Sequence, residues 1–545
     1  MEKLPRELIL IVLDLLDVSS CYSLSATSKF YAALYRYHTT SNRSSTVLDA
    51  VYHRYETLFR WLLPDEVSIS VCVKNDICKT AAAVGSLEIL KYVHQKQNIY
   101  INEIMTKPNK PFDIIEEAIG NGHLEIVKWC RANGWIWGTR LCDCAALNGH
   151  FEILQWLVNN GCPMSSSTCA NAAENGHIEI LKWLHENECD WDETSCDNAA
   201  LNGHWDILKY LHENGCGWED NTCDNAVING HFEILKWLRE NGCSWDKWTC
   251  ASAAIHDHLD ILKYLHENGC PWDERTCDFA AENGNLEILK WAHENGCPWN
   301  CSTYEGAAKN GHFEVLIWLR EHGCPWNERT CVEAAAHGHF EILQWLRENG
   351  CPWKARTCTV AAANGHFEIL QWLRENGCSL DANAITLAAV NGHLAILKWL
   401  HENKCPRDAN ACYCAAASGR LEILKYLHEN GYPWDEKACS AASCTGHFKI
   451  LKWLHKNGCP WDRWSCAKAA QNGHFEILKW LHENRCPWDE RVCVEAAANG
   501  HFEILKWLHE NECPWNAETR NYATENGYVD IIKWLDEKGC PHDID

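Results

Sequence analysis

The chain has 545 residues, 46% of them apolar, and a formal net charge of −25. A nucleic-acid-binding surface neutralises phosphates with Lys and Arg, so this acidic balance predicts that the chain does not bind nucleic acid. No apolar run approaches the roughly 18 residues of a membrane helix, and the acids Glu7, Asp14 and Asp17 interrupt the apolar start. We therefore expect no membrane insertion and an intracellular protein, whose 34 cysteines are mostly reduced thiols.

The apolar spacing of the first 40 residues predicts three short amphipathic helices, the first beginning near Pro5. This segment resembles an F-box in Leu4, Pro5, Glu7, Leu8, Ile11, Leu15, Leu16, Asp17, Leu24, Ser28, Lys29, Phe30 and Tyr31. In the F-box family such a segment docks on the Skp-type adaptor of a cullin ubiquitin ligase. The resemblance implies that the adaptor-binding residues are Leu4, Pro5, Leu8, Ile11, Leu15 and Leu16. The alternative is that these helices only cap the apolar face of the first repeat.

A 27-residue repeat fills most of the remaining chain. The decamer NGHFEILKWL occurs three times, at 229–238, 472–481 and 499–508. We count its His as position 0. This position recurs in sixteen repeats without insertion or deletion, from His123 to Tyr528, and a weaker copy begins at Gly85. A fixed period of this length is typical of a solenoid, in which each unit buries its apolar face on its neighbours.

Each repeat is predicted to form two helices. From position 0, H-F-E-I-L-K-W-L-H-E-N-G places apolar residues at +1, +3, +4, +6 and +7, which is a helical stripe. Gly at +11 and Pro at +13 end this helix in most repeats. The stretch T-C-D-x-A-A-E-N predicts another, shorter helix, which its Thr or Ser caps and whose paired Ala allow close packing.

The repeat resembles the ankyrin repeat. GHFEILKWLHENGC aligns without gaps to the outer ankyrin helix, and the Ala-Ala pair falls in register with the inner one. The unit departs from the usual 33 residues by being six shorter, lacks the T-P-L-H start, and loses the residues of the β-hairpin finger. Short Trp- and Cys-rich units of this kind are similar to ankyrin arrays of giant DNA viruses and some protists. The resemblance implies an all-α, ankyrin-like solenoid of about 17 repeats with shortened hairpins.

Some positions are nearly constant. Trp occupies +6 in thirteen repeats and +14 in twelve. Such rings could stack nucleobases, but the chain lacks a matching basic balance, so we interpret them as packing between repeats. Cys occupies +12 and +19 in fourteen and twelve repeats, as at Cys270 and Cys277. Their spacing differs from the C-x₂₋₄-C pairs of zinc sites, so we interpret them as small buried side chains and predict no metal and no cofactor.

Position 0 is His in thirteen repeats. A catalytic role is improbable, because an active site needs one special place rather than many equal ones. We expect this His to bond to the backbone at the turn between helices. The sequence contains no Gly-rich phosphate loop and no nucleophile elbow, so we predict that the protein is not an enzyme.

Positions −10, −7 and −6 vary among repeats. Ankyrin arrays bind partners on the concave side, which by resemblance carries these positions. The predicted target-binding residues are Trp248, Arg275, Phe279, Arg329, Arg356, Tyr413 and Trp464. The alternative for an Arg at −10 is that it stacks on the Trp three residues before it.

These features predict a non-catalytic adaptor. Its F-box-like module (1–40) would hold a ubiquitin ligase, and its array (76–545) would capture an unknown target protein. A linker and degenerate repeat (41–75) would join the two. The alternative is an ankyrin-like scaffold whose N-terminal helices only cap the array. We expect the protein in the cytoplasm, that of a host if it is viral, with the nucleus also open.

Overall fold

The computed structural model describes residues 71–96, 112–135, 137–218, 220–408 and 410–541. Over these ranges the chain forms 34 helices and no strand, which confirms the all-α array without hairpin strands. The helices alternate as the first and second helix of each repeat, giving the 17 predicted pairs. The F-box-like module, residues 1–40, lies outside the described residues, as does most of 41–75.

Two compact units divide the chain, Met1–Trp272 and Asp273–Asp545. The described helices of the first unit are α6 (Val71–Val84), α7 (Leu87–Lys96), α9 (Phe112–Gly120), α10 (Leu124–Ala132), α11 (Thr139–Leu147), α12 (Phe151–Asn159), α13 (Ser166–Glu174), α14 (Ile178–Glu186), α15 (Glu193–Leu201), α16 (Trp205–Glu213), α17 (Asp220–Ile228), α18 (Phe232–Glu240), α19 (Lys247–Ile255) and α20 (Leu259–Glu267).

The helices of the second unit are α21 (Glu274–Glu282), α22 (Leu286–Glu294), α23 (Cys301–Asn310), α24 (Phe313–Glu321), α25 (Glu328–Ala336), α26 (Phe340–Glu348), α27 (Ala355–Ala363), α28 (Phe367–Glu375), α29 (Ala382–Asn391), α30 (Leu394–Glu402), α31 (Ala411–Ala417), α32 (Leu421–Glu429), α33 (Glu436–Cys444), α34 (Phe448–Lys456), α35 (Arg463–Gln471), α36 (Phe475–Glu483), α37 (Glu490–Ala498), α38 (Phe502–Glu510), α39 (Ala517–Glu525) and α40 (Val529–Glu537).

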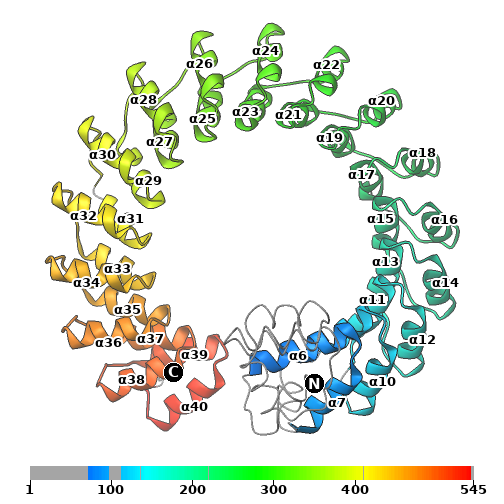
Figure 1. The fold of residues 1–545 in the computed structure, drawn as a ribbon, viewed down its shortest axis with the longest axis horizontal. Helices are drawn as coiled ribbons and strands as arrows, with labels where there is room; N and C mark the ends of the chain where they lie inside the picture. The colour runs from blue at the N-terminus through cyan, green and yellow to red at the C-terminus, as the bar shows by residue number, and fades with distance from the viewer. Residues whose placement is uncertain (1–70, 97–111, 136, 219, 409, 542–545) are drawn as a thin grey trace, which may run out of the picture. The chain divides into compact units, whose positions relative to one another are not determined.

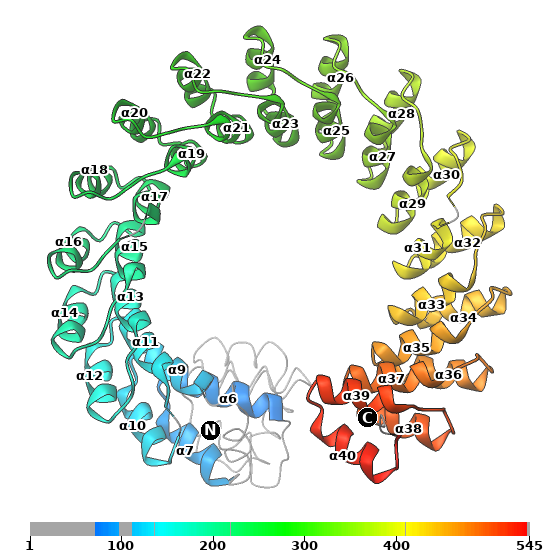
Figure 2. The same cartoon turned by 180° about the vertical axis from the view of Figure 1, so that it is seen from behind.

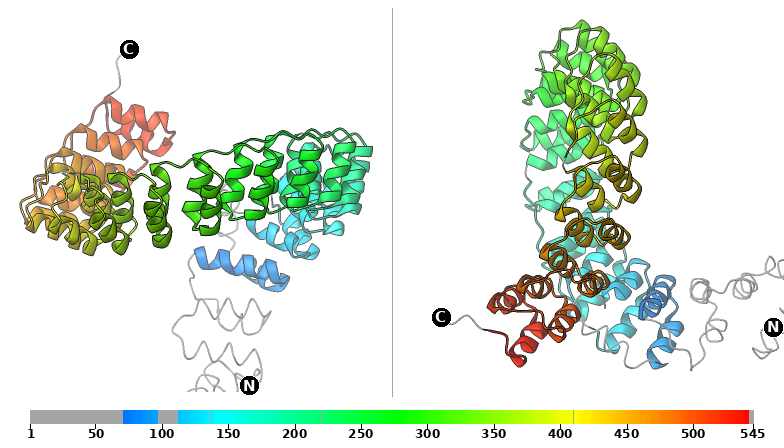
Figure 3. Two further views of the ribbon diagram at one scale, coloured as in Figure 1. Left: turned by 90° about the horizontal axis from the view of Figure 1, so that it is seen from above. Right: turned by 90° about the vertical axis from the view of Figure 1, so that its left-hand side faces the viewer.

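The first helices are α6 and the odd-numbered helices from α9, and the second helices are α7 and the even-numbered helices from α10. Within each unit the first helices line the concave edge and the second helices the outer edge (Figure 1 and Figure 2). Each first helix packs on its own second helix and on the next first helix of its unit. Neighbouring helices of a unit therefore lie side by side in a single row of pairs (Figure 3).

The first helix starts at a capping residue that lies before the predicted Thr. Asp246 is the N-cap of α19: its carboxylate accepts a hydrogen bond from the Trp248 N–H at 2.6 Å, and its own N–H donates to Thr249 Oγ1 at 3.1 Å. Such a reciprocal pair satisfies two N–H groups that a helix start leaves free. The predicted Thr cap is therefore wrong, because the Thr lies in the first turn and supports the cap. The helix thus starts earlier, so it is not the shorter one: α13 and α14 both have nine residues.

The second helix ends at position +11 with a positive φ, which favours Gly. Gly161, with φ of +80°, shows this conformation. Four repeats hold another residue there at a φ of 55° to 62°, namely Glu188, Lys404, Arg485 and Glu512. Just before it, the amide of the Asn at +10 donates to the carbonyl of the residue at +6, as from Asn160 to Trp156 at 2.7 Å. Both features satisfy the free carbonyl groups at this helix end.

The His at position 0 joins each repeat to the preceding one. His150 Nε2 lies 3.0 Å from the carbonyl oxygen of Gly120, at the end of the preceding first helix. The same contact joins His366 to Ala336 and His501 to Gln471, 30 residues earlier in each case. The predicted bond to backbone is confirmed, and its acceptor lies in the preceding repeat rather than in the turn of its own repeat.

This contact also accounts for the Gly at position −1. Gly149 has a φ of +73°, and a Cβ added to it would lie 2.5 Å from Cε1 of His177 in the next repeat. Real Cβ atoms essentially never approach that closely. Gly is therefore required both by the turn and by the ring packed on it.

A matched pair of glycines separates these two requirements. Gly149→Ala and Gly161→Ala both place a methyl group on a left-handed backbone, which costs roughly 1–2 kcal/mol. Only Gly149 has a neighbour in the way, since nothing lies within 4 Å of a Cβ at Gly161. We expect Gly149→Ala to lose about 1 kcal/mol more, because the His177 ring and its hydrogen bond to Leu147 must move. Urea unfolding followed by circular dichroism measures both, and equal losses would contradict this account.

Candidate functional site

The Trp at position +14 is stacked on by a residue of its own second helix. His293 lies flat on Trp299 with ring centroids 3.7 Å apart, and the guanidinium of Arg347 lies 4.2 Å from the ring centre of Trp353. All twelve Trp at this position have such a His or Arg partner at +8. These rings are therefore structural, as predicted.

The Trp at position +6 continues the stack into the next repeat. Trp507 meets Trp488 of the preceding repeat edge to face at 5.9 Å and Phe475 of that repeat at 5.7 Å. Edge-to-face packing of this kind is favourable beyond the area it buries. The outer edge of the array is thus held by a series of aromatic contacts from repeat to repeat.

The varied positions lie on the first helices. Trp248 of α19, Tyr413 of α31 and Trp464 of α35 are 46%, 40% and 38% exposed. Five of the eight exposed large apolar side chains among the described residues lie on first helices, namely Trp248, Leu387, Tyr413, Trp464 and Tyr522. Large apolar side chains left in water on one face of an array favour an interaction surface. We call these first-helix side chains at positions −10, −7 and −6 the first-helix surface.

Two predicted residues, Arg275 and Phe279, come together in one cleft. Both are half-buried and line an open cleft of about 370 Å³ over α21, α23 and α25. The other lining residues are Asp278, Glu282, Ser302, Glu305, Gly306, Lys309 and Glu333. Arg329 reaches its edge, since its Nε lies 3.5 Å from Glu305 Oε2. Arg356, Tyr413 and Trp464 lie on other repeats.

Carboxylates pair with two of the three predicted Arg residues, Arg275 and Arg329. Arg275 forms a two-bonded ion pair with Asp273, the N-cap of its own helix, at 2.8 Å. Arg329 pairs with Glu305, a carboxylate of the preceding first helix. At Trp464 the cations lie over the exposed ring itself: Arg491 is 4.8 Å and Lys468 5.8 Å from its centre.

The sequence analysis did not select Leu387, 37% exposed, or Tyr522, 43% exposed, as site residues. Their signal was a large apolar residue at position −6, where most repeats carry a polar or small one. It also missed the cleft over α21, α23 and α25, which we call the acidic cleft after its carboxylates Asp278, Glu282, Glu305 and Glu333. In the sequence, a single carboxylate at a varied position looks like an ordinary solvated residue.

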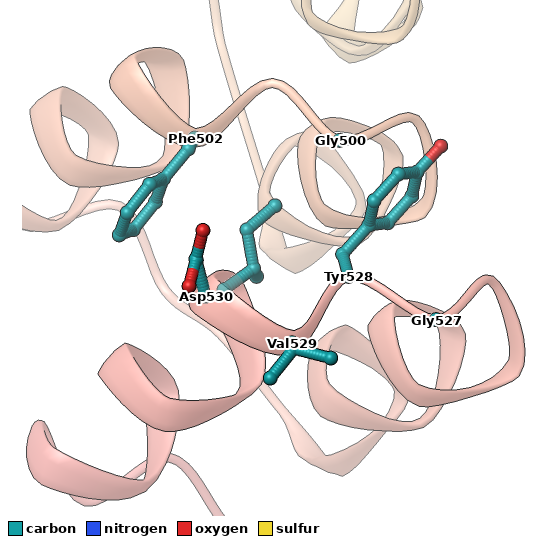
Figure 4. A pocket seen from close by; sticks show the side chains of 7 residues that line it. Gly500, Phe502, Gly527, Tyr528, Val529 and Asp530 are labelled. Atoms are coloured by element: carbon teal, nitrogen blue, oxygen red, sulfur yellow. The ribbon is translucent and has the colours of Figure 1, made fainter. Parts of the chain in front are cut away.

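A second cleft of about 370 Å³ lies at the last repeat and is lined by Gly500, Phe502, Gly527, Tyr528, Val529, Asp530 and Ile531 (Figure 4). Tyr528 takes the place of His there, and its ring lies 2.7 Å from a Cβ built on Gly500. Val529 is 56% exposed. The lining comes from the starts of the last two second helices, and Asp530 is its one carboxylate.

Metal and membrane sites were sought over the same part of the chain. No group of three or more His, Cys, Asp or Glu side chains in the described ranges could hold a metal ion. No helix among the described residues is both long enough and apolar enough to cross a bilayer.

Family models described as ankyrin repeats match the chain. One model, which describes three ankyrin repeats in a row, matches the chain at 141–222, 278–357, 359–438 and 466–545. Together these ranges cover more than half of the 545 residues. Another, of many copies, matches 115–158, 250–293 and 437–482. No curated protein matches the chain.

Solved structures similar to the chain include the pentatricopeptide repeat protein PPR10 from maize. It is 12% identical, with 100% of this chain and 95% of that chain covered and a TM-score of 0.30. The same protein in complex with an 18-nt psaJ RNA element is 10% identical, with coverages of 99% and 95% and a TM-score of 0.33. At these identities the likeness concerns the fold alone.

The predicted exclusion of nucleic acid does not stand. The exclusion was drawn from net charge. Net charge is a sum over the whole chain and does not fix the local charge of one surface, so it does not support that exclusion.

Asp278 in the acidic cleft gives a test of the local electrostatics. Burial raises its pKa to about 6, although the hydrogen bond that Thr303 donates to its carboxylate at 2.5 Å lowers it. A folded-state pKa above the ordinary value means that the folded chain binds the extra proton. The contribution of Asp278 to stability is therefore full below about pH 4 and lost as pH rises to about 6.

We expect Asp278→Asn to be more favourable for stability, relative to the original chain, at pH 7 than at pH 4. Urea midpoints at the two pH values measure this difference. Asp197→Asn, which changes the equivalent acceptor of Thr222, is the control for the hydrogen bond itself. A pH-independent shift for Asp278→Asn would contradict the raised pKa.

Proposed function

This chain belongs to the ankyrin repeat family, and we propose that it is a non-catalytic adaptor that captures a target protein on its first-helix surface. The observation that carries the proposal is the placement of five of eight exposed large apolar side chains on first helices, at positions that vary between repeats. Residues fixed by the array serve their neighbours, whereas varied and exposed ones are available to a partner.

Three further features support this reading. The rings at +14 are stacked within their own repeats, so they offer no open series of faces to a ligand. The exposed aromatic and Arg residues of the first helices are of the types that dominate binding hot spots. Both clefts are open to solvent, and their linings contain carboxylates but no His or Cys that could form a nucleophile–base pair.

The other half of the proposal rests on the sequence of residues 1–40. We propose that Leu4, Pro5, Leu8, Ile11, Leu15 and Leu16 dock on a Skp-type adaptor of a cullin ubiquitin ligase, as the F-box resemblance implies. The target held by the array would then be presented to the ligase, in the cytoplasm. In the alternative, these helices cap the first repeat and the protein is an ankyrin-like scaffold.

The double variant Leu4→Ala, Pro5→Ala tests the docking half. It should abolish binding to a purified Skp-type adaptor in a pull-down, while circular dichroism of the array is unchanged because the F-box resemblance implies a core separate from that of the array. Glu2→Ala with Lys3→Ala, polar changes beside the proposed contact, should leave binding intact. Loss of helical signal in the first variant would favour the cap, and no adaptor binding by the original chain would refute the F-box.

Target capture is tested with the partner recovered by pull-down of the intact chain and then purified. Trp248→Ala and Trp464→Ala should each weaken binding by about 2 kcal/mol if they are hot spots, measured by calorimetry. Stability should change by less than about 0.5 kcal/mol, because both side chains are exposed.

The matched control lies on the second helices. Glu287→Ala and Glu341→Ala remove exposed carboxylates from α22 and α26 and should leave capture intact. If these changes weaken binding and the Trp changes do not, the binding face is the outer edge and the proposal is wrong.

A further inference from the structure

The two cysteine positions meet inside the same repeat. Eleven repeats carry one Cys on the first helix, eight residues before position 0, and another in the turn, twelve residues after it. In ten of these the two thiols lie close enough for one to shift the pKa of the other. For Cys223 and Cys243, 20 residues apart, the two Sγ atoms lie 3.0 Å from one another.

The pairing differs from the one that the spacing along the chain suggested. Cys270 and Cys277, seven residues apart, belong to different repeats, and the partner of Cys277 is Cys297. The partner lies across the helix pair because the first helix and the turn after the second helix enclose one core. We call these ten pairs the dithiol pairs.

Each dithiol pair is buried and held in place from two sides. The first-helix thiol is fully buried, as at Cys277, and the turn thiol nearly so, as at Cys297 with 3% exposed. Cys297 Sγ also lies 3.4 Å from the carbonyl oxygen of Asp273, the N-cap of the same first helix. The turn sulfur is thus fixed between the partner thiol and the start of the helix that carries it.

A zinc site does not fit this geometry. Structural zinc takes four N or S ligands. No third His, Cys, Asp or Glu joins any such pair in the part of the chain that the structure describes. Two sulfurs in contact can instead form one covalent bond, with the sulfurs moving about 1 Å closer to reach bonding distance.

We propose that the dithiol pairs are modification sites at which a peroxide forms a disulfide within one repeat. One sulfur attacks a peroxide oxygen, and the O–O bond breaks to give a sulfenic acid and, with hydrogen peroxide, water. The partner sulfur then displaces the sulfenic oxygen as a second water. Two thiols and one hydrogen peroxide thus give one disulfide and two waters. Each disulfide would tie the first helix to the end of the second.

The environment sets the order of these steps. The side-chain interaction with Cys297 and burial both raise the pKa of Cys277, so this thiol stays protonated at neutral pH and its attack on a peroxide is slow. The second step is intramolecular and fast, because the partner sulfur is already in contact. A paired thiol should therefore end as a disulfide rather than as a higher oxide.

The chain supplies its own matched controls. Cys324 and Cys405 occupy the same turn position and are 3% and 5% exposed, but the first-helix position opposite them holds Tyr304 and Ile385. Four other thiols, Cys144, Cys301, Cys414 and Cys444, are more exposed than the dithiol pairs. The effect of burial on thiol oxidation can thus be separated from the effect of a partner thiol without any substitution.

The experiment treats the intact reduced chain with hydrogen peroxide, alkylates the remaining thiols in denaturant, and identifies peptides by mass spectrometry without reduction. We expect a loss of up to twenty of the 34 thiols, two for each dithiol pair. Disulfide-linked peptides should join Cys223 to Cys243 and Cys277 to Cys297, while Cys324 and Cys405 are recovered alkylated. Dithiothreitol should restore the lost thiols.

The variant Cys277→Ala leaves Cys297 without its partner, so Cys297 should form no disulfide, and any loss of its thiol should appear as sulfinic or sulfonic acid that dithiothreitol does not restore. The proposal is overturned if Cys324 and Cys405 form dithiothreitol-reversible disulfides as readily as their paired counterparts. It is equally overturned if the recovered disulfides join the four more exposed thiols instead. If the Cys277→Ala chain fails to fold, the comparison of Cys297 with Cys324 in the original chain still decides.

Discussion

The array depends on the contact between the His ring of one repeat and the Gly turn of the repeat before it. The ring nitrogen of His150 bonds to a carbonyl at the end of the preceding first helix, one of those that a helix end leaves without a partner. The ring of His177 lies against Gly149, where a side chain would collide with it. The Gly turn of one repeat is therefore also the surface on which the His ring of the next repeat packs. The ring reaches this turn only if both helices of the repeat keep their length. This accounts for sixteen repeats without an insertion or deletion.

Two of the three substitutions at position 0, Arg420 and Tyr528, obey the same constraint. Arg420 places its guanidinium near Gly392 and donates from Nε to the Val390 carbonyl at 3.1 Å. Tyr528 places its ring over Gly500. What the position requires is a flat group of the right reach, with a hydrogen bond to the backbone in most repeats. A titratable ring repeated for this purpose carries no implication of catalysis.

This constraint divides the surface of the protein. On the second helices and the turns after them, the Trp rings stack on His or Arg of their own repeat and contact Trp of the next repeat. Trp488 shows both contacts, with His482 and with Trp507. The first helices contact each other, and their side chains at position −10 are exposed in most repeats, whereas those at −7 and −6 are mostly half-buried. Variety that does not disturb the array can accumulate there. The proposed adaptor function follows from this division rather than from any single residue.

The amino-acid sequence by itself determined the period, the two helices per repeat, the lack of strands and the structural role of His and Trp. Each of these follows from local spacing, which a strict repeat displays many times over. The tertiary structure alone decided which side chains face each other. It made Asp246 the cap of a first helix, paired Arg275 and Arg329 with carboxylates, and brought Cys223 into contact with Cys243 within a repeat. These contacts depend on how the two helices of a repeat pack around one core. The separation of two residues along the chain does not indicate the distance between them in that packing.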